Sequence, residues 1–190
     1  MRPRTLILAF APLIVFSVLT RILPSGLIGA AALAAAVIVL IAELTSRPGW
    51  PPKLLSTCLL ALLGPIAVLG FTVGQGGDAW LAIWGGAGIG LAVGLLILAL
   101  IPVMPFTEQF ARETTPRAYW SSPTFRQVNR VLSAGWGVAI FLVGVCRVIA
   151  AAISQSTSRR LPELLLGLVI PVAIILAALK FSHCCYRSLQ

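Results

Sequence analysis

Six apolar stretches fill most of this chain, and each comes close to the length that a helix needs to cross a lipid bilayer. A spanning helix takes about 20 mostly apolar residues. Only 10% of the 190 residues are charged and 59% are apolar, whereas a soluble domain carries about 25% charged residues. This composition excludes a soluble globular domain and a disordered chain. The sequence therefore predicts an all-α, polytopic integral membrane protein.

The predicted spans pair into three helical hairpins within a single transmembrane domain, residues 1–190. They cover residues 5–23, 26–42, 54–73, 79–103, 132–153 and 162–182. The first two are short, and only Arg21, Pro24 and Ser25 part them. A spanning hairpin is the prediction there, and a single bent or re-entrant element is the alternative.

The net charge of +9 would suggest nucleic-acid binding in a soluble protein. Here the basic residues flank apolar runs, where they act as topology signals and phospholipid contacts, so we expect no nucleic-acid partner. Ten Lys and Arg residues fall on the side of the two termini and three on the other, with Arg147 inside a span left out of the count. By the positive-inside rule, both termini should be cytoplasmic.

One predicted span carries small residues at every fourth position, which gives a flat face that a neighbouring backbone can approach closely. These residues are Ala82, Gly86, Gly90 and Gly94. The same spacing in the second span, at Gly26, Ala30 and Ala34, predicts the partner face. Gly85 and Gly88 are expected on the opposite side of the fourth helix. The pattern leaves open whether the partner lies in this chain or in a second copy, so a homo-oligomer is one possibility.

Residues 104–131 are predicted to form an elbow before the fifth span, beginning with an interfacial amphipathic helix. Glu108 and Arg112 are four apart on that helix and can pair. Ser122, followed by Pro123, has the residue types of a helix cap and first turn. We therefore expect a second helix to start at Pro123 and to continue into the fifth span.

The elbow also concentrates the residues that suit contact with lipid or an anion. Trp and Tyr are typical of headgroup depth, and Arg pairs with phosphate. The candidate functional or lipid-contact residues are Arg112, Arg117, Trp120, Arg126, Asn129, Arg130 and, within the fifth span, Arg147. Two interpretations compete, an elbow anchored by aromatic and basic side chains and a specific anion site made by the four arginines of the elbow. The sequence favours the anchor, because topology requires basic loops in any case.

Part of this segment resembles a known family. The run from Tyr119 and Trp120 through Phe125-Arg126, Asn129-Arg130 and Trp136-Gly137 is similar to bacterial intracellular septation protein A and its inner-membrane relatives, in which a Trp precedes an Arg-rich, Asn-containing segment. The resemblance covers residues 104–182. It implies a place in the bacterial cytoplasmic (inner) membrane, near division and envelope synthesis, with no known catalysis.

The residues offer little for catalysis or metal binding, so we expect no enzyme activity, cofactor or metal site. His183, Cys184 and Cys185 are contiguous and cannot all wrap one tetrahedral ion. Glu108 and Glu113 are five apart, on roughly opposed helix faces, which suits no acid–base pair.

Arg147 is the one charge expected inside the membrane, about 9 Å before the end of its span. It can snorkel to the outer headgroups or pair with Asp78, and both interpretations rank above anion transport.

The predicted function is therefore a non-enzymatic scaffold or assembly factor of the bacterial envelope, linked to septation. Its expected partners are membrane lipids and envelope or cell-division membrane proteins. The alternative is a small transporter or channel for an anionic or lipid-like solute, and the scarcity of polar residues that could line a cavity counts against it.

Overall fold

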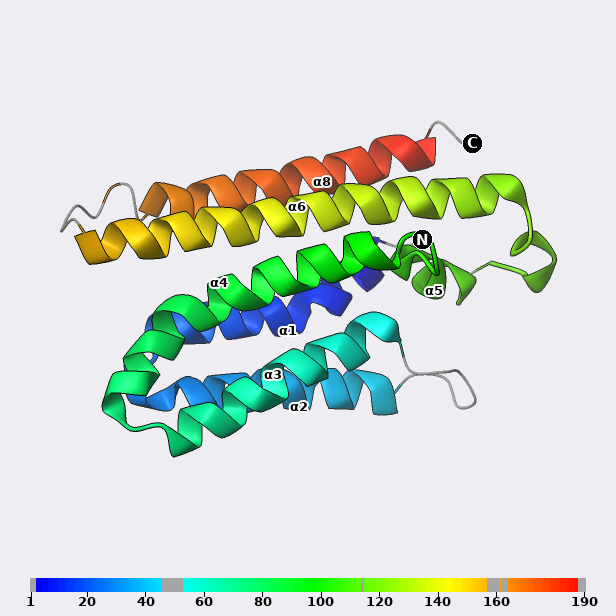
Figure 1. Ribbon diagram of the computed structural model, residues 1–190. Helices are drawn as coiled ribbons and strands as arrows, with labels where there is room; N and C mark the ends of the chain where they lie inside the picture. The colour runs from blue at the N-terminus through cyan, green and yellow to red at the C-terminus, as the bar shows by residue number, and fades with distance from the viewer. Residues whose placement is uncertain (1–2, 46–52, 114, 157–160, 162–163, 188–190) are drawn as a thin grey trace. The chain divides into compact units, whose positions relative to one another are not determined.

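The computed structural model describes residues 3–45, 53–113, 115–156, 161 and 164–187. These residues form helices, with no β-strand among them, as Figure 1 shows. Four helical segments are long and apolar enough to cross a membrane: Leu54–Thr72, Ile83–Leu100, Pro123–Ser154 and Leu165–Cys185. Two further apolar helical segments, Phe10–Thr20 and Ile28–Leu44, are shorter. The predicted all-α membrane class is confirmed, and the count of six spans stays a prediction.

The chain divides into two compact units. One unit is Arg4–Ile89, and the other is Gly90–Gln190 together with Met1–Pro3. Helix α4 (Gln75–Leu100) contributes residues to both.

The first unit holds α1 (Pro3–Ile22) from Arg4 onward, a 3₁₀ turn η1 (Ser25–Leu27), α2 (Ile28–Leu44) and α3 (Leu54–Thr72). Residues 5–42 therefore form two helices that run in opposite directions in Figure 1, as the hairpin prediction required.

Helices α2 and α3 pack closely through glycine. A Cβ built on Gly70 would lie 2.5 Å from the backbone nitrogen of Gly29, so neither position has room for a side chain. The face that α2 buries is Ile28, Gly29, Ala31, Ala32, Ala35 and Val39.

The face predicted on the second span takes no part in this contact, because Gly26 and Ala34 are exposed and Ala30 is only partly buried. Its pairing with the small-residue face of the fourth span stays a prediction. Helix α2 carries alanine on several faces, so the spacing of small residues alone could not identify the packed one.

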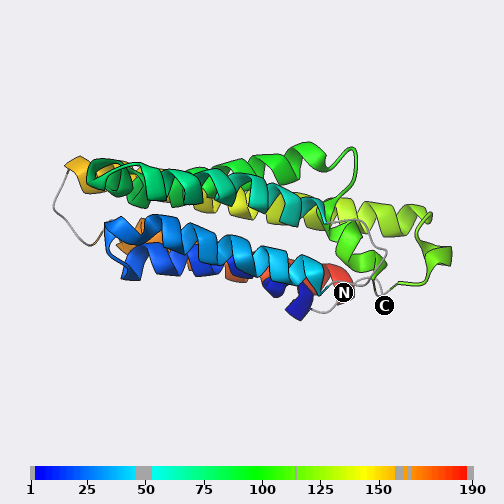
Figure 2. The ribbon, with the colours of Figure 1, turned by 90° about the horizontal axis from the view of Figure 1, so that it is seen from below.

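The second unit is built around α6 (Pro123–Ser156), an unbroken helix of 34 residues (Figures 1 and 2). It starts where the sequence predicted, because the Phe125 N–H donates to Ser122 Oγ at 3.1 Å and so satisfies one of the free amides of the first turn. Before it come α5 (Phe106–Arg112) and the 3₁₀ turn η2 (Arg117–Tyr119). After it come a π-helical turn η3 (Leu165–Val169) and α8 (Ile170–Arg187).

Helices α6 and α8 lie side by side and run in opposite directions (Figure 1). A buried hydrogen bond joins them, since Trp136 Nε1 donates to Ser182 Oγ at 2.9 Å. Ser182 Oγ in turn donates to the Ala178 carbonyl oxygen at 2.9 Å. In a lipid bilayer, where no hydrophobic driving force brings helices together, polar contacts of this kind help to hold them side by side.

The small-residue face of α4 meets α6. A Cβ on Gly90 would lie 3.2 Å from Gly144 Cα, and one on Gly94 would lie 2.6 Å from Phe141 Cα. Gly90 and Gly94, two of the four residues of the predicted packing face, thus lie against α6, whereas the sequence predicted a partner face on the second span.

The remaining predictions for α4 have mixed outcomes. Gly86 is buried, and the side chain of Ala82 lies outside the described part of the chain. Gly85, expected on the opposite side of the helix, is buried, and a Cβ placed on it would have Ile66 Cδ1 as its nearest neighbour at 3.9 Å. Gly88 is exposed as expected, and a Cβ placed on it would meet no neighbouring atom within 4 Å.

Candidate functional site

Helix α5 is held against α6 by a buried network of hydroxyl groups. Thr107 Oγ1 donates to the Asn129 carbonyl oxygen at 2.8 Å and lies 2.9 Å from Ser133 Oγ. The Thr107 N–H also donates to Ser133 Oγ, at 3.3 Å. Both hydroxyl side chains are completely buried. These bonds fix α5, and with it the positions of the charged side chains at its end.

Most of α5 is buried, so its aromatic face packs inward. Phe106 and Phe110 lie edge to face with ring centroids 6.3 Å apart, and each is 2–3% exposed. Helix α5 thus keeps the predicted place in the chain, but it does not present a free apolar face. Its location at a membrane interface stays a prediction.

The predicted pairing of Glu108 and Arg112 is confirmed. Arg112 Nη2 donates to Glu108 Oε1 at 2.6 Å, one helical turn apart. Glu108 is 5% exposed. A buried carboxylate is costly unless it is paired, and the guanidinium supplies that partner.

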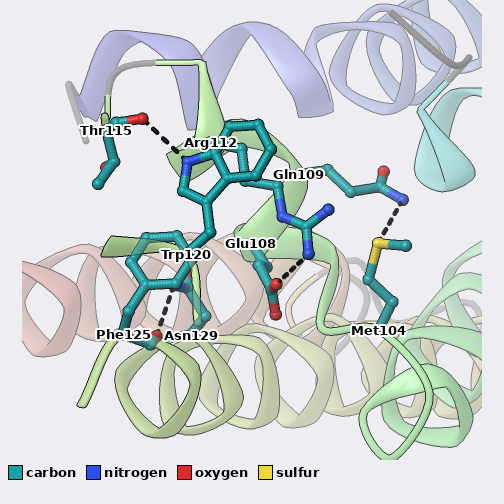
Figure 3. Close-up of polar contacts among 8 residues, drawn as sticks. All are labelled: Met104, Glu108, Gln109, Arg112, Thr115, Trp120, Phe125 and Asn129. Carbon is teal, nitrogen blue, oxygen red and sulfur yellow. Dashed lines mark hydrogen bonds and ion pairs between the residues drawn. The ribbon is translucent and has the colours of Figure 1, made fainter. Parts of the chain in front are cut away.

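Two of the four arginines of the elbow lie over the ring of Trp120. The Arg112 Cζ atom lies 5.0 Å from the ring centroid and the Arg117 Cζ atom lies 5.6 Å from it, both within the range of a cation–π contact. The indole is fixed in turn, because Trp120 Nε1 donates to the Thr115 carbonyl oxygen at 2.9 Å. Figure 3 shows the Arg112 guanidinium between the Trp120 indole and the Glu108 carboxylate. We call Glu108, Arg112, Arg117 and Trp120 the Arg–Trp cluster.

Two polar atoms, one in this cluster and one on α6, are buried without a hydrogen-bond partner among the described residues. One is Arg112 Nε. The other is Asn129 Oδ1, whose companion Nδ2 donates to the Phe125 carbonyl oxygen at 2.8 Å. A buried donor or acceptor without a partner costs about 1–3 kcal/mol, so each such atom calls for an explanation.

The other predicted site residues lie apart from the cluster. Arg126 and Arg130 are both exposed on the first turns of α6. Arg147 is half-buried, nine residues before Ser156, so α6 extends further beyond it than the predicted span end at residue 153. At about 1.5 Å per residue the helix runs about 14 Å past Arg147.

Asp78, the predicted partner of Arg147, is buried in the first turn of α4 with Oδ1 unpartnered among the described residues. The two residues belong to different units, so their pairing stays a prediction.

The described residues contain no group of three His, Cys, Asp or Glu side chains that could hold a metal ion. At the end of α8, His183 and Cys184 are exposed and Cys185 is half-buried.

Comparisons of the chain with protein-family models, with curated proteins and with solved structures find no match.

Sequence reasoning missed the residues that build the site. Nothing in the sequence connects Thr107 with Ser133, which are 26 residues apart and are single hydroxyl groups in apolar surroundings. The only available signal was that both lie on predicted helices at the ends of one elbow, too weak a signal to pair them.

Proposed function

We propose that this protein is a non-enzymatic scaffold or assembly factor of the bacterial cell envelope, linked to septation. It resides in the inner membrane with both termini in the cytoplasm. The observation that carries the proposal is the Arg–Trp cluster: a fixed set of cationic and aromatic side chains at one end of a long apolar helix. Such side chains suit recognition of a partner at a membrane surface.

The chemistry of the cluster supports recognition over catalysis. A general acid or base must be able to exchange its proton with a substrate. Glu108 is buried and engaged by Arg112 at 2.6 Å, so its carboxylate is committed to a structural pair. The resemblance of residues 104–182 to septation protein A supports the same role and supplies the link to division.

Cross-linking followed by affinity purification from intact bacterial membranes tests the proposal. We expect division or envelope-synthesis proteins to be captured with the wild-type chain and to be lost with Arg117→Glu. Lys180→Glu is the matched control, because Lys180 is an exposed cation on α8, outside the cluster. Capture that is equal for all three chains would contradict a role for the cluster in assembly.

A second candidate is a transporter or channel for an anionic or lipid-like solute, and Asp78 is the residue that tests it. Asp78 is 7% exposed and Oδ1 has no hydrogen-bond partner among the described residues. A carboxylate oxygen that is buried without a partner is costly, so its burial calls for a structural or a functional explanation. An Asp78→Asn chain that folds normally but loses solute uptake into vesicles would favour this candidate over the scaffold.

A further inference from the structure

We propose that the Arg–Trp cluster is a binding site for the headgroup of an anionic phospholipid, with the lipid phosphate held by Arg112 and Arg117. The proposal goes beyond the scaffold role, which would stand if the site failed. It also holds whichever way the chain is oriented in the membrane.

The charge balance of the cluster favours an anion. Two guanidinium groups share one aromatic ring, and a single carboxylate, Glu108, neutralises one of them. Two like charges that share one ring repel one another, and an anion beside them lowers that repulsion. Arg126 and Arg130, exposed on the adjoining turns of α6, add to the positive potential that would attract it.

The geometry of the cluster favours a phosphate. Arg112 is oriented by Glu108, and Trp120 is oriented by the Thr115 carbonyl, so the cluster is in place before any ligand arrives. The Arg112 side chain is 32% exposed, so part of its guanidinium can be reached by a ligand from outside. Phosphate oxygens are strong acceptors that match the planar fork of guanidinium, and a preorganised site loses little entropy on binding.

The length of α6 favours a lipid as the source of that phosphate. Its 34 residues span about 51 Å, whereas the hydrocarbon core of a bilayer is about 30 Å thick. A helix that crosses the bilayer must therefore extend into a headgroup layer. Trp120 lies just before its first residue, Pro123, and tryptophan is the aromatic residue typical of that depth.

The test uses the purified full-length chain in detergent, mixed separately with phosphatidylglycerol, phosphatidylcholine and inorganic phosphate. Bound lipid is counted by native mass spectrometry, and thermal unfolding is followed in parallel. We expect phosphatidylglycerol to be retained in preference to phosphatidylcholine, whose choline ammonium opposes binding beside the arginines. We expect phosphatidylglycerol to raise the melting temperature and inorganic phosphate to leave it unchanged.

The Arg117→Gln variant tests whether the lipid binds at the Arg–Trp cluster. Arg117 is exposed, so this change should leave folding intact while weakening retention of phosphatidylglycerol about tenfold, the value of one charge-assisted hydrogen bond. Lys180→Gln removes an exposed cation elsewhere and should retain the lipid as the wild type does.

Equal retention of the two lipids, or equal losses in Arg117→Gln and Lys180→Gln, would overturn the proposal. Stabilisation by inorganic phosphate as strong as that by phosphatidylglycerol would also overturn it, in favour of a site for the free ion.

Discussion

Gly94 lies against the backbone of Phe141, so close that a methyl group on Gly94 would come within 2.6 Å of Phe141 Cα. At this position the backbones of α4 and α6 are so close that only glycine, which has no Cβ, fits between them. Because lipid solvates apolar side chains as well as another helix does, such close approach of backbones is a main source of helix association in a membrane.

Replacing Gly94 with leucine should therefore separate the two helices. We expect Gly94→Leu to lower the stability of the purified protein in detergent by about 1–3 kcal/mol or more, the cost typical of overpacking. Thermal unfolding measures the loss. Gly88→Leu on the same helix is the control, because Gly88 is exposed with open space around it. If the two variants melted together, the close contact between α4 and α6 would be refuted.

Removing the cap of α6 should loosen its first turn. Ser122 Oγ accepts the Phe125 N–H, and loss of such a cap typically costs about 1 kcal/mol. We expect Ser122→Ala to speed hydrogen exchange of the first-turn amides, and Ser122→Asn to restore most of the protection. The neighbouring Ser121→Ala, at an exposed position, should change nothing. Equal exchange in the two alanine variants would show that Ser122 does not cap the helix.

Thr107 and Ser133 should be energetically coupled. Their hydroxyl oxygens are 2.9 Å apart and fully buried, so removal of either leaves its partner short of a hydrogen bond. In a double-mutant cycle with Thr107→Val and Ser133→Ala, we expect a coupling free energy of about 0.5–3 kcal/mol. Thr124→Val, an exposed threonine on α6, provides the uncoupled control against Ser133→Ala. A coupling near zero for the buried pair would mean that α5 is held by other contacts.

Variants of Arg147 and Asp78 test whether the charge predicted inside the membrane is balanced by a carboxylate at the start of α4. We expect Arg147→Lys to be mild, because an ammonium group can also pair or snorkel, and Arg147→Ala to lower the amount of folded protein in membranes. If the two side chains pair, Asp78→Asn should partly rescue Arg147→Ala. Strictly additive losses in the double variant would show that they do not touch.

Topology reporters test the orientation. The bias of ten basic residues to three predicts a cytoplasmic signal from fusions at Gln190 and Arg117 and a periplasmic signal at Gly74. A periplasmic signal at Gln190 would contradict the six-span arrangement. A cytoplasmic signal at Gly74 would reverse it.

Local features of this fold were predictable because neighbouring residues determine them. The start of α6 at Pro123 and the pair of Glu108 with Arg112 each depend on residues within one turn. The close packing at Gly90 and Gly94 followed from spacing on a single helix.

Which helices pack against each other could not be predicted, because lipid solvates apolar side chains and removes the contrast between a polar and an apolar helix face. In a soluble protein the buried face of a helix is apolar and the outer face is polar. Here Ala34 is exposed and Ala35 is buried on the same helix, and nothing in their chemistry separates them. The pairing of Thr107 with Ser133 depends on how α5 folds back onto α6. The residue types near either position do not specify that fold.

The contact between Gly29 and Gly70 has a consequence for how this fold could change over generations. Neither position tolerates even a methyl group, because a Cβ on Gly29 would lie 2.8 Å from the Gly70 carbonyl carbon. Exposed neighbours on the same helices, such as Leu33 and Val68, can be exchanged freely among apolar residues. Homologous chains that have diverged beyond recognition in overall identity should therefore still share this pair of glycines, one on each helix of the hairpin.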